Sequence, residues 1–184
     1  MRYAVAPQHP RPRTLIHPGR PNPVRMHCVT SRHGRHVRLS LPSGASLFDA
    51  IVKPLARLGI ESASITLLGG YYDKFQYSVA PSNPSKQTVI AYGSPIHTGQ
   101  TYMVFGTANL GEGSNGLPLI HCHATLRTES GELRGGHVLP ERCIVGSHPI
   151  TALVIAHEDF VVRQVDDSET NMPALQPYGV DIDE

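Results

Sequence analysis

The chain has 184 residues, of which 40% are hydrophobic, and its formal net charge is +1 at pH 7. This length suits one domain with an ordinary hydrophobic core. No apolar run reaches the length of a transmembrane helix, and the first residues lack the apolar segment of a signal peptide. We therefore expect an intracellular, cytoplasmic protein that does not contact a membrane.

The cysteines, Cys28, Cys122 and Cys143, are odd in number and far apart in the sequence. This pattern argues against a disulfide framework and favours a reducing compartment. Cys122 lies between two histidines, and we interpret it as a core residue rather than as a metal ligand.

The small net charge hides an uneven distribution of charged residues. The first 48 residues contain no acidic residue, and their basic residues are Arg2, Arg11, Arg13, Arg20, Arg25, Arg32, Arg35 and Arg38. After Cys143, eight acidic residues accompany one arginine, Arg163. We predict a basic arm over residues 1–23 and an acidic tail over residues 166–184, which either bind each other across subunits or meet outside partners.

Proline is frequent in the predicted arm, which excludes a helix there and favours an extended chain. Residues 18–21, PGRP, resemble the Gly-Arg-Pro core of an AT-hook but lack its usual flanking arginine. A packed extended arm is the better interpretation of this partial match. If the chain binds DNA, we expect phosphate contacts by Arg11, Arg13 and Arg20.

Downstream of the arm, the hydrophobic pattern predicts one helix and several strands. Ser46 is a suitable N-cap for a helix that runs to about Leu58, with one apolar face and Gly59 after its end. Residues 69–74 are predicted as a connection, and residues 109–116 as a flexible glycine-rich loop. Apolar alternation or short apolar runs predict strands at residues 24–30, 36–41, 63–68, 75–79, 88–92, 101–108, 120–127, 133–139, 143–146, 151–156 and 160–165.

Three histidines lie within a predicted β-hairpin over residues 118–139. In its first strand, His121 and His123 share one face because successive side chains of a strand point to opposite faces. His137 lies on the returning strand, after a turn that contains Gly131. Whether His137 joins the other two depends on the register of the hairpin.

The register depends on the form of the turn. A two-residue turn puts His137 opposite Ala124, on the wrong face. A three-residue turn, or a bulge at Gly135 and Gly136, puts His137 opposite Thr125 and diagonal to His123. Two adjacent glycines in a strand are typical of a bulge, so we favour the second register.

Three neutral imidazoles on a rigid sheet suit Zn²⁺ or another divalent transition metal, with a fourth position open to water, a substrate or a neighbouring subunit. The alternative is that His121, His123 and His137 are ordinary polar residues of a half-exposed sheet. An HxH motif with a third histidine on the paired strand favours the metal site. Glu141 could orient an imidazole from behind, although a solvated turn residue is the plainer interpretation.

The motifs HCHATL, ESGE and LRGGHVL resemble the plants-and-prokaryotes conserved (PPC) domain, whose hallmark is an HxH strand followed by a GGH strand. The segment SLFDAIVKPLARLGIESASITLLGG is similar to the family's main helix and the glycine-ended strand after it. The resemblance covers residues 24–165, which we take as one domain. The Arg-Phe-Glu motif of plant members has no counterpart near residues 99–102, so partner contacts attributed to that motif do not carry over.

The resemblance implies an α+β fold, in which a mostly antiparallel β-sheet packs on one main helix. It also implies a homotrimer and a metal ion held by His121, His123 and His137. Plant members of the family are nuclear proteins with AT-hooks, which implies DNA as a candidate partner.

Three functions follow as alternatives. The first is a trimeric metal-binding protein, with zinc as the expected metal, that also binds DNA. The second is a metal-dependent hydrolase or lyase, in which a bound zinc ion lowers the pKa of a water towards about 7. The third is a structural metal that holds the trimer together. The sequence names neither a general base nor a substrate, so catalytic residues are unknown.

Overall fold

Helix α1 (Leu47–Arg57) begins where the sequence predicts it, in a computed structural model that describes residues 15–24 and 27–179. Ser46 Oγ accepts a hydrogen bond from the backbone N–H of Asp49 at 3.0 Å, which caps the first turn. The helix ends at Arg57 with Leu58 as its C-cap, and Gly59 follows with a φ of 68°, a conformation that favours glycine. Among the described residues, no helix has the length and apolar character needed to cross a membrane.

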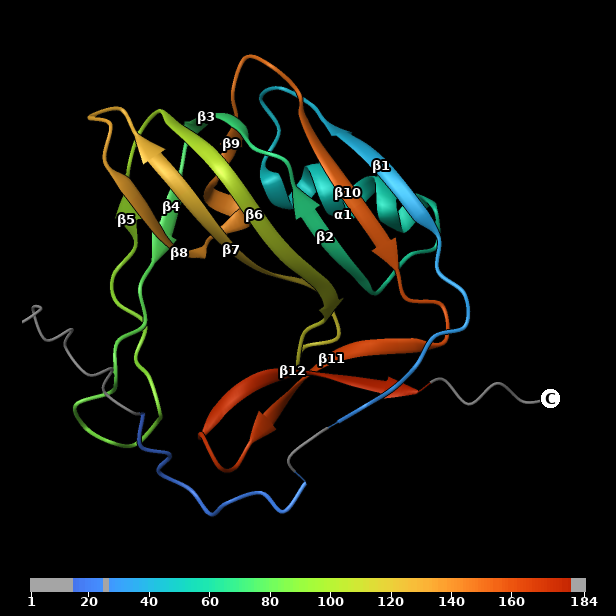
Figure 1. The fold of residues 1–184 in the computed structure, drawn as a ribbon, viewed down its shortest axis with the longest axis vertical. Helices are drawn as coiled ribbons and strands as arrows, with labels where there is room; N and C mark the ends of the chain where they lie inside the picture. The colour runs from blue at the N-terminus through green and yellow to red at the C-terminus, as the bar shows by residue number, and fades with distance from the viewer. Residues whose placement is uncertain (1–14, 25–26, 180–184) are drawn as a thin grey trace, which may run out of the picture.

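The strands form one continuous, mostly antiparallel sheet (Figure 1). They are β1 (His36–Leu41), β2 (Ala63–Leu67), β3 (Gly70–Lys74), β4 (Gln76–Ser78), β5 (Ile96–His97), β6 (Thr101–Glu112), β7 (Pro118–Thr128), β8 (Leu133–Val138), β9 (Ile144–Val145), β10 (Ile150–Ala156), β11 (Phe160–Asp167) and β12 (Met172–Gly179). The main path runs β1-β10-β2-β6-β7-β8-β4-β5, and both β11 and β3 branch from β6. A 3₁₀ helix, η1 (Pro140–Arg142), follows β8. This architecture confirms the predicted α+β fold class.

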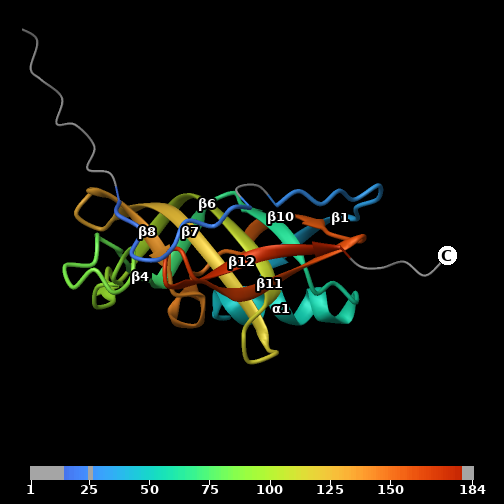
Figure 2. The same cartoon turned by 90° about the horizontal axis from the view of Figure 1, so that it is seen from below.

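Helix α1 covers one face of the sheet, and we call the opposite face the open face (Figure 2). Along β7, alternate residues are buried towards the helix, and they are Ile120, Cys122, Ala124 and Leu126. They belong to the same core cluster as the buried residues of α1. Cys122 is thus a core residue, and the histidines on either side of it point towards the open face.

Residues 166–179 form most of a β-hairpin instead of the predicted acidic tail. Strand β11 continues to Asp167, and β12 pairs with it along its whole length. Pro173 and Pro177, which suggest a tail in the sequence, both lie in β12. Because β12 pairs only with β11 among the described strands, its outer edge needs no backbone donors, and proline is tolerated there.

The described part of the basic arm packs against the turn of this hairpin. His17 Nδ1 lies 2.6 Å from Glu169 Oε1, and the Asn22 N–H donates a hydrogen bond to Glu169 Oε2 at 2.6 Å. Closer to β1, Arg35 Nε lies 2.6 Å from Glu158 Oε1. The described parts of the basic and acidic segments therefore contact each other within one subunit. The charges in the sequence do not show whether such a contact lies within one subunit or between two.

Several other local predictions were wrong. None of the described residues of 24–30 lies in a strand, and residues 88–92 contribute only an isolated bridge at Ile90. Residues 70–74, predicted as a connection, form β3, and β6 extends through the first part of the predicted glycine-rich loop to Glu112. The alternation of apolar and polar residues is a property of a single segment. A strand also needs a neighbouring strand whose backbone N–H and C=O groups are free to form hydrogen bonds with it.

Candidate metal centre

The three histidines meet on the open face, at the β7–β8 hairpin. His121 and His123 share this face because they alternate with buried residues of β7. His137 of β8 lies directly opposite His123 in the strand register. The hairpin therefore brings together all three residues that the sequence predicts as metal ligands.

The predicted register of this hairpin was wrong in detail. The turn is longer than either predicted form, since residues 128–132 connect the paired residues Arg127 and Leu133. Hydrogen bonds of 2.9 Å close it, from the Gly131 N–H to the Thr128 carbonyl and from the Thr128 N–H to the Glu132 carbonyl. The longer turn places His137 on the same face as His123 without any bulge.

The two glycines before His137 permit close packing of strands. Strand β8 pairs continuously with β7 through Gly135 and Gly136, so no bulge lies there. A Cβ atom at Gly136 would lie 2.5 Å from the carbonyl oxygen of Ser78 in β4, closer than real Cβ atoms approach. Glycine at this position therefore lets β4 pair with β8 at Ser78 and His137. The strand that carries His137 is thus held from both edges.

The imidazole nitrogens are close enough to share one metal ion. His121 Nε2 and His123 Nε2 are 3.1 Å apart. One ring nitrogen from each of the three histidines lies within 4.8 Å of the others. Two ligands at about 2.0–2.1 Å from a tetrahedral zinc ion are about 3.3 Å apart. The two histidines of β7 therefore already have nearly the spacing of two zinc ligands.

Burial and mutual proximity favour the neutral form of these imidazoles. Burial, followed by the neighbouring His121 and His123, lowers the pKa of His137 to about 4. Burial, followed by His123, also lowers the pKa of His121. Since neutral imidazole is the form that binds metal, His121 and His137 are in their ligand form at neutral pH.

One buried nitrogen in the cluster lacks a partner. His137 Nδ1 is shielded from solvent and forms no hydrogen bond within the residues that the structure describes. A buried polar atom without a partner costs free energy, so such an atom marks a place where an ion or an ordered water belongs. The three imidazoles, the neutral form of His121 and His137, and the unpartnered His137 Nδ1 together fit a bound metal ion.

The surroundings of the cluster leave one side of it accessible. The ring centroid of Tyr92, in the loop between β4 and β5, lies 5.0 Å from that of His137. His123 is exposed and borders a shallow depression of about 360 Å³ between β6, β7 and β8. Asn109 and Thr107 of β6 lie opposite His121 and His123 in the register. Sequence reasoning missed Tyr92, because no local pattern marks a contact that depends on the fold of a long loop.

Of the other predicted site residues, the structure describes Glu141 and Arg20, and neither forms a hydrogen bond with the three histidines. Glu141 is an exposed residue of η1, and in the described part of the chain its carboxylate forms no hydrogen bond with any of the three histidines. Its role behind an imidazole stays a prediction. Arg20 is exposed on the arm, whereas Arg11 and Arg13 lie outside the described residues.

Two features define the class of this protein. One is the main helix that packs on the sheet, and the other is the histidine cluster that the sheet presents. The family model of the Plants and Prokaryotes Conserved (PCC) domain matches residues 29–155. This match spans more than half of the chain and includes the whole histidine hairpin, and the chain belongs to this family. The resemblance of the HxH and GGH motifs to the PPC domain is thereby confirmed. No protein of curated function is a significant match.

Solved structures share the fold at low sequence identity. A metal-containing protein from Archaeoglobus fulgidus is 18% identical, with a TM-score of 0.68 over 82% of this chain and 99% of its own. A plant- and prokaryote-conserved protein from Pyrococcus horikoshii is also 18% identical, with a TM-score of 0.64 over 84% and 100%. A protein from Ralstonia eutropha JMP134, named as a candidate DNA-binding protein, is 16% identical, with a TM-score of 0.58 over 76% and 88%.

Proposed function

We propose that this protein binds zinc, or another divalent transition metal, through His121, His123 and His137, and that it works as a homotrimer in an intracellular compartment. The observation that carries the metal proposal is the cluster itself, in which three imidazoles on one rigid face lie within reach of one ion. A protein of the same fold is a metal-containing protein, which adds support. The free cysteines fit a reducing compartment.

Exposed apolar side chains on β6 and β10 support the trimer. Val104, Phe105, Leu153 and Ile155 are each 43–47% exposed. Large apolar side chains gathered on one part of a surface are typical of subunit contacts. A neighbouring subunit docked there would lie close to the histidine cluster, where it could supply a fourth ligand.

Elemental analysis combined with native mass spectrometry tests both parts of this proposal. We expect about one metal ion per subunit in a trimeric wild-type protein, and loss of the ion from His123→Ala. His97→Ala removes an exposed histidine outside the cluster and should keep the metal. A wild type without metal contradicts the metal site, and a monomeric mass contradicts the trimer. Dissociation of the trimer on chelation would assign the metal a structural role as well.

The basic arm supports DNA binding as a second function. Arg20 is exposed, and Arg11 and Arg13 add positive charge to the same segment. A protein of the same fold is named as a candidate DNA-binding protein. Three arms in one trimer would bind a duplex multivalently through its phosphates, so the affinity would fall steeply with salt.

Gel retardation of a short duplex over increasing salt tests this second function. Replacing Arg11, Arg13 and Arg20 by Ala together should abolish retardation, because the phosphate contacts are lost. A matched control replaces three exposed arginines of the folded body, Arg57, Arg127 and Arg142, by Ala. Equal retardation of the arm variant and the wild type would refute the arm as the DNA-binding element.

The depression beside His123 favours a metal-dependent hydrolase or lyase as the alternative function. A bound zinc ion would act there as a Lewis acid. Two hydroxyl side chains, Thr107 and Thr125, line the depression, and no carboxylate does. A general base would therefore have to come from a substrate or from a neighbouring subunit. Turnover of an ester, phosphoester or carbon–oxygen lyase substrate that disappears in His123→Ala would support this alternative.

A further inference from the structure

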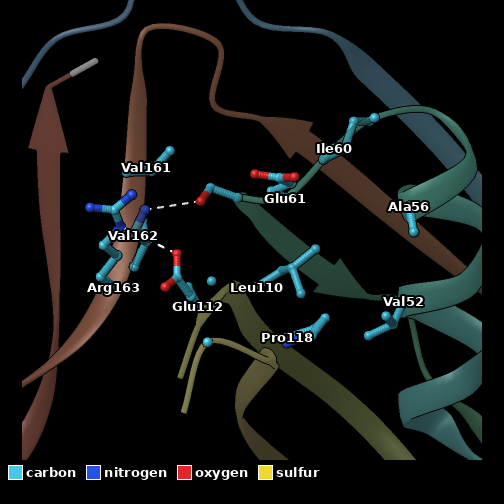
Figure 3. A pocket seen from close by; sticks show the side chains of 14 residues that line it. Val52, Ala56, Ile60, Glu61, Leu110, Glu112, Pro118, Val161, Val162 and Arg163 are labelled. Atoms are coloured by element: carbon cyan, nitrogen blue, oxygen red, sulfur yellow. Dashed lines mark hydrogen bonds and ion pairs between the residues drawn. The ribbon is translucent and has the colours of Figure 1, made fainter. Parts of the chain in front are cut away.

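A second concave site lies on the helix side of the sheet, away from the metal centre. It is a cavity of about 320 Å³ between the end of α1, the connection from α1 to β2, the end of β6 and strand β11 (Figure 3). None of the three histidines lines it. Its size is at the lower end of the range for small-molecule sites, so it suits a ligand of modest size.

Apolar side chains form most of the walls. Figure 3 shows Val52 and Ala56 of α1 on one side of the cavity and Val162 of β11 on the other, with Leu110 and Pro118 between them. Walls of this kind favour a ligand with an apolar body, because binding removes apolar surface of both partners from water.

The charged groups at the cavity carry an excess of negative charge. Glu112 Oε2 lies 3.3 Å from Arg163 Nε, so these two groups neutralise each other. Glu61 is the remaining carboxylate at the cavity, and within the described residues it forms neither a hydrogen bond nor an ion pair. An unpaired carboxylate beside apolar walls favours a ligand whose polar end is positively charged.

Two contacts fix the wall that β11 provides. The backbone N–H of Val162 donates a hydrogen bond of 2.9 Å to Ser62 Oγ in a buried position. A Cβ atom at Gly111 would lie 2.5 Å from the carbonyl oxygen of Val162, so glycine permits the close approach of β11 to β6. The cavity is therefore formed before any ligand arrives, which lowers the entropic cost of binding.

We propose that this cavity binds a small amphipathic cation of the primary alkylamine class. The alkyl chain lies between Val52, Ala56 and Val162, and the ammonium group lies beside Glu61. The site works independently of the metal centre.

Isothermal titration calorimetry with three probes of equal chain length tests the proposal. Hexylammonium, hexan-1-ol and hexanoate share an alkyl chain and differ in the charge of the head group. We expect hexylammonium to bind most tightly and hexanoate most weakly. Glu61→Gln should reduce the affinity for hexylammonium about two- to fivefold and remove its advantage over hexan-1-ol. Glu129→Gln, which replaces a carboxylate of the β7–β8 turn, is the matched control and should leave the affinity for hexylammonium unchanged.

A cavity-filling variant tests the location. Ala56→Phe places a ring into the cavity from an exposed helix position, so it should abolish binding of all three probes while the metal content and the thermal midpoint stay unchanged. His123→Ala should bind hexylammonium as the wild type does, which excludes the metal centre as the amine site. The proposal is overturned if the wild type does not bind hexylammonium, if hexanoate binds as well, or if Ala56→Phe retains binding.

Discussion

The histidine hairpin and the basic arm hold their functional residues in different ways. His121, His123 and His137 lie on paired strands inside one continuous sheet, so the strand register sets their separations. Residues 15–23 of the arm have no regular secondary structure and are tied to the β11–β12 turn by a few polar contacts, several of them to Glu169. The histidine cluster is therefore preorganised, whereas the arm can open locally without unfolding the domain.

Removal of one histidine from the hairpin should have the largest effect. We expect His137→Ala to weaken metal affinity by more than about 100-fold, because a tetrahedral site loses one of its three protein ligands. Competition with a chromogenic chelator measures this change. His148→Ala removes an exposed histidine outside the hairpin and serves as the control. Unchanged affinity of His137→Ala would show that β8 contributes no ligand.

A change beside the site tests whether strand packing positions His137. Gly136→Ala forces a Cβ atom against the Ser78 carbonyl, so we expect a loss of about 1–3 kcal/mol in unfolding free energy and weaker metal binding. Urea unfolding and metal titration measure the two effects. Gly179→Ala, where no atom lies within 4 Å, is the matched control. If Gly136→Ala matches the wild type in both measurements, β4 does not constrain the hairpin.

A change at the arm should act locally. Glu169→Ala removes the acceptor of the Asn22 N–H and the partner of His17, which contribute about 1 kcal/mol per hydrogen bond. We expect amide exchange at Asn22 to accelerate about fivefold, with metal content unchanged. Glu158→Ala, which breaks the Arg35 pair outside the arm, is the control. Loss of metal from Glu169→Ala would show that the arm and the hairpin are coupled.

The smallest effect should be a pH dependence at His157. Its ring stacks on Phe160 with centroids 4.3 Å apart, and burial lowers its pKa. The unfolded chain takes up a proton near its ordinary pKa of about 6.5 while the folded chain stays neutral, so folding stability falls as the pH drops below about 6.5.

His157→Gln should make this loss of stability shallower, because glutamine does not titrate. Urea unfolding of the chelated protein at about pH 7 and about pH 5 measures the slope. His97→Gln, at an exposed position, is the matched control. An identical slope in His157→Gln and the wild type would show that His157 does not contribute to acid sensitivity.

The helix and the identity of the histidine cluster were predictable because their signals are local. Ser46 caps the helix that follows it, and His121 and His123 share a face in any regular strand. The position of His137 was less predictable, since it depends on a turn length that Gly131 alone does not specify. The motif thus predicted the members of the cluster, and the fold supplied their register.

Other features depend on contacts between distant segments. The prolines of β12 suggest a tail when the segment stands alone, and only its pairing with β11 makes it a strand. Tyr92 and Ser78 contact the cluster from a loop and a strand that carry no metal-binding signal. The meeting of His17 with Glu169 likewise follows from the path of the whole chain.

Anomalous X-ray diffraction at the zinc absorption edge, on crystals of zinc-loaded protein, is the most direct test of a metal site formed by the three histidines. We expect one anomalous peak per subunit on the open face, about 2.0–2.1 Å from one nitrogen of each of His121, His123 and His137. A zinc ion bound elsewhere, or a zinc ion that only two of these histidines contact, would contradict the proposal that strand register builds the site.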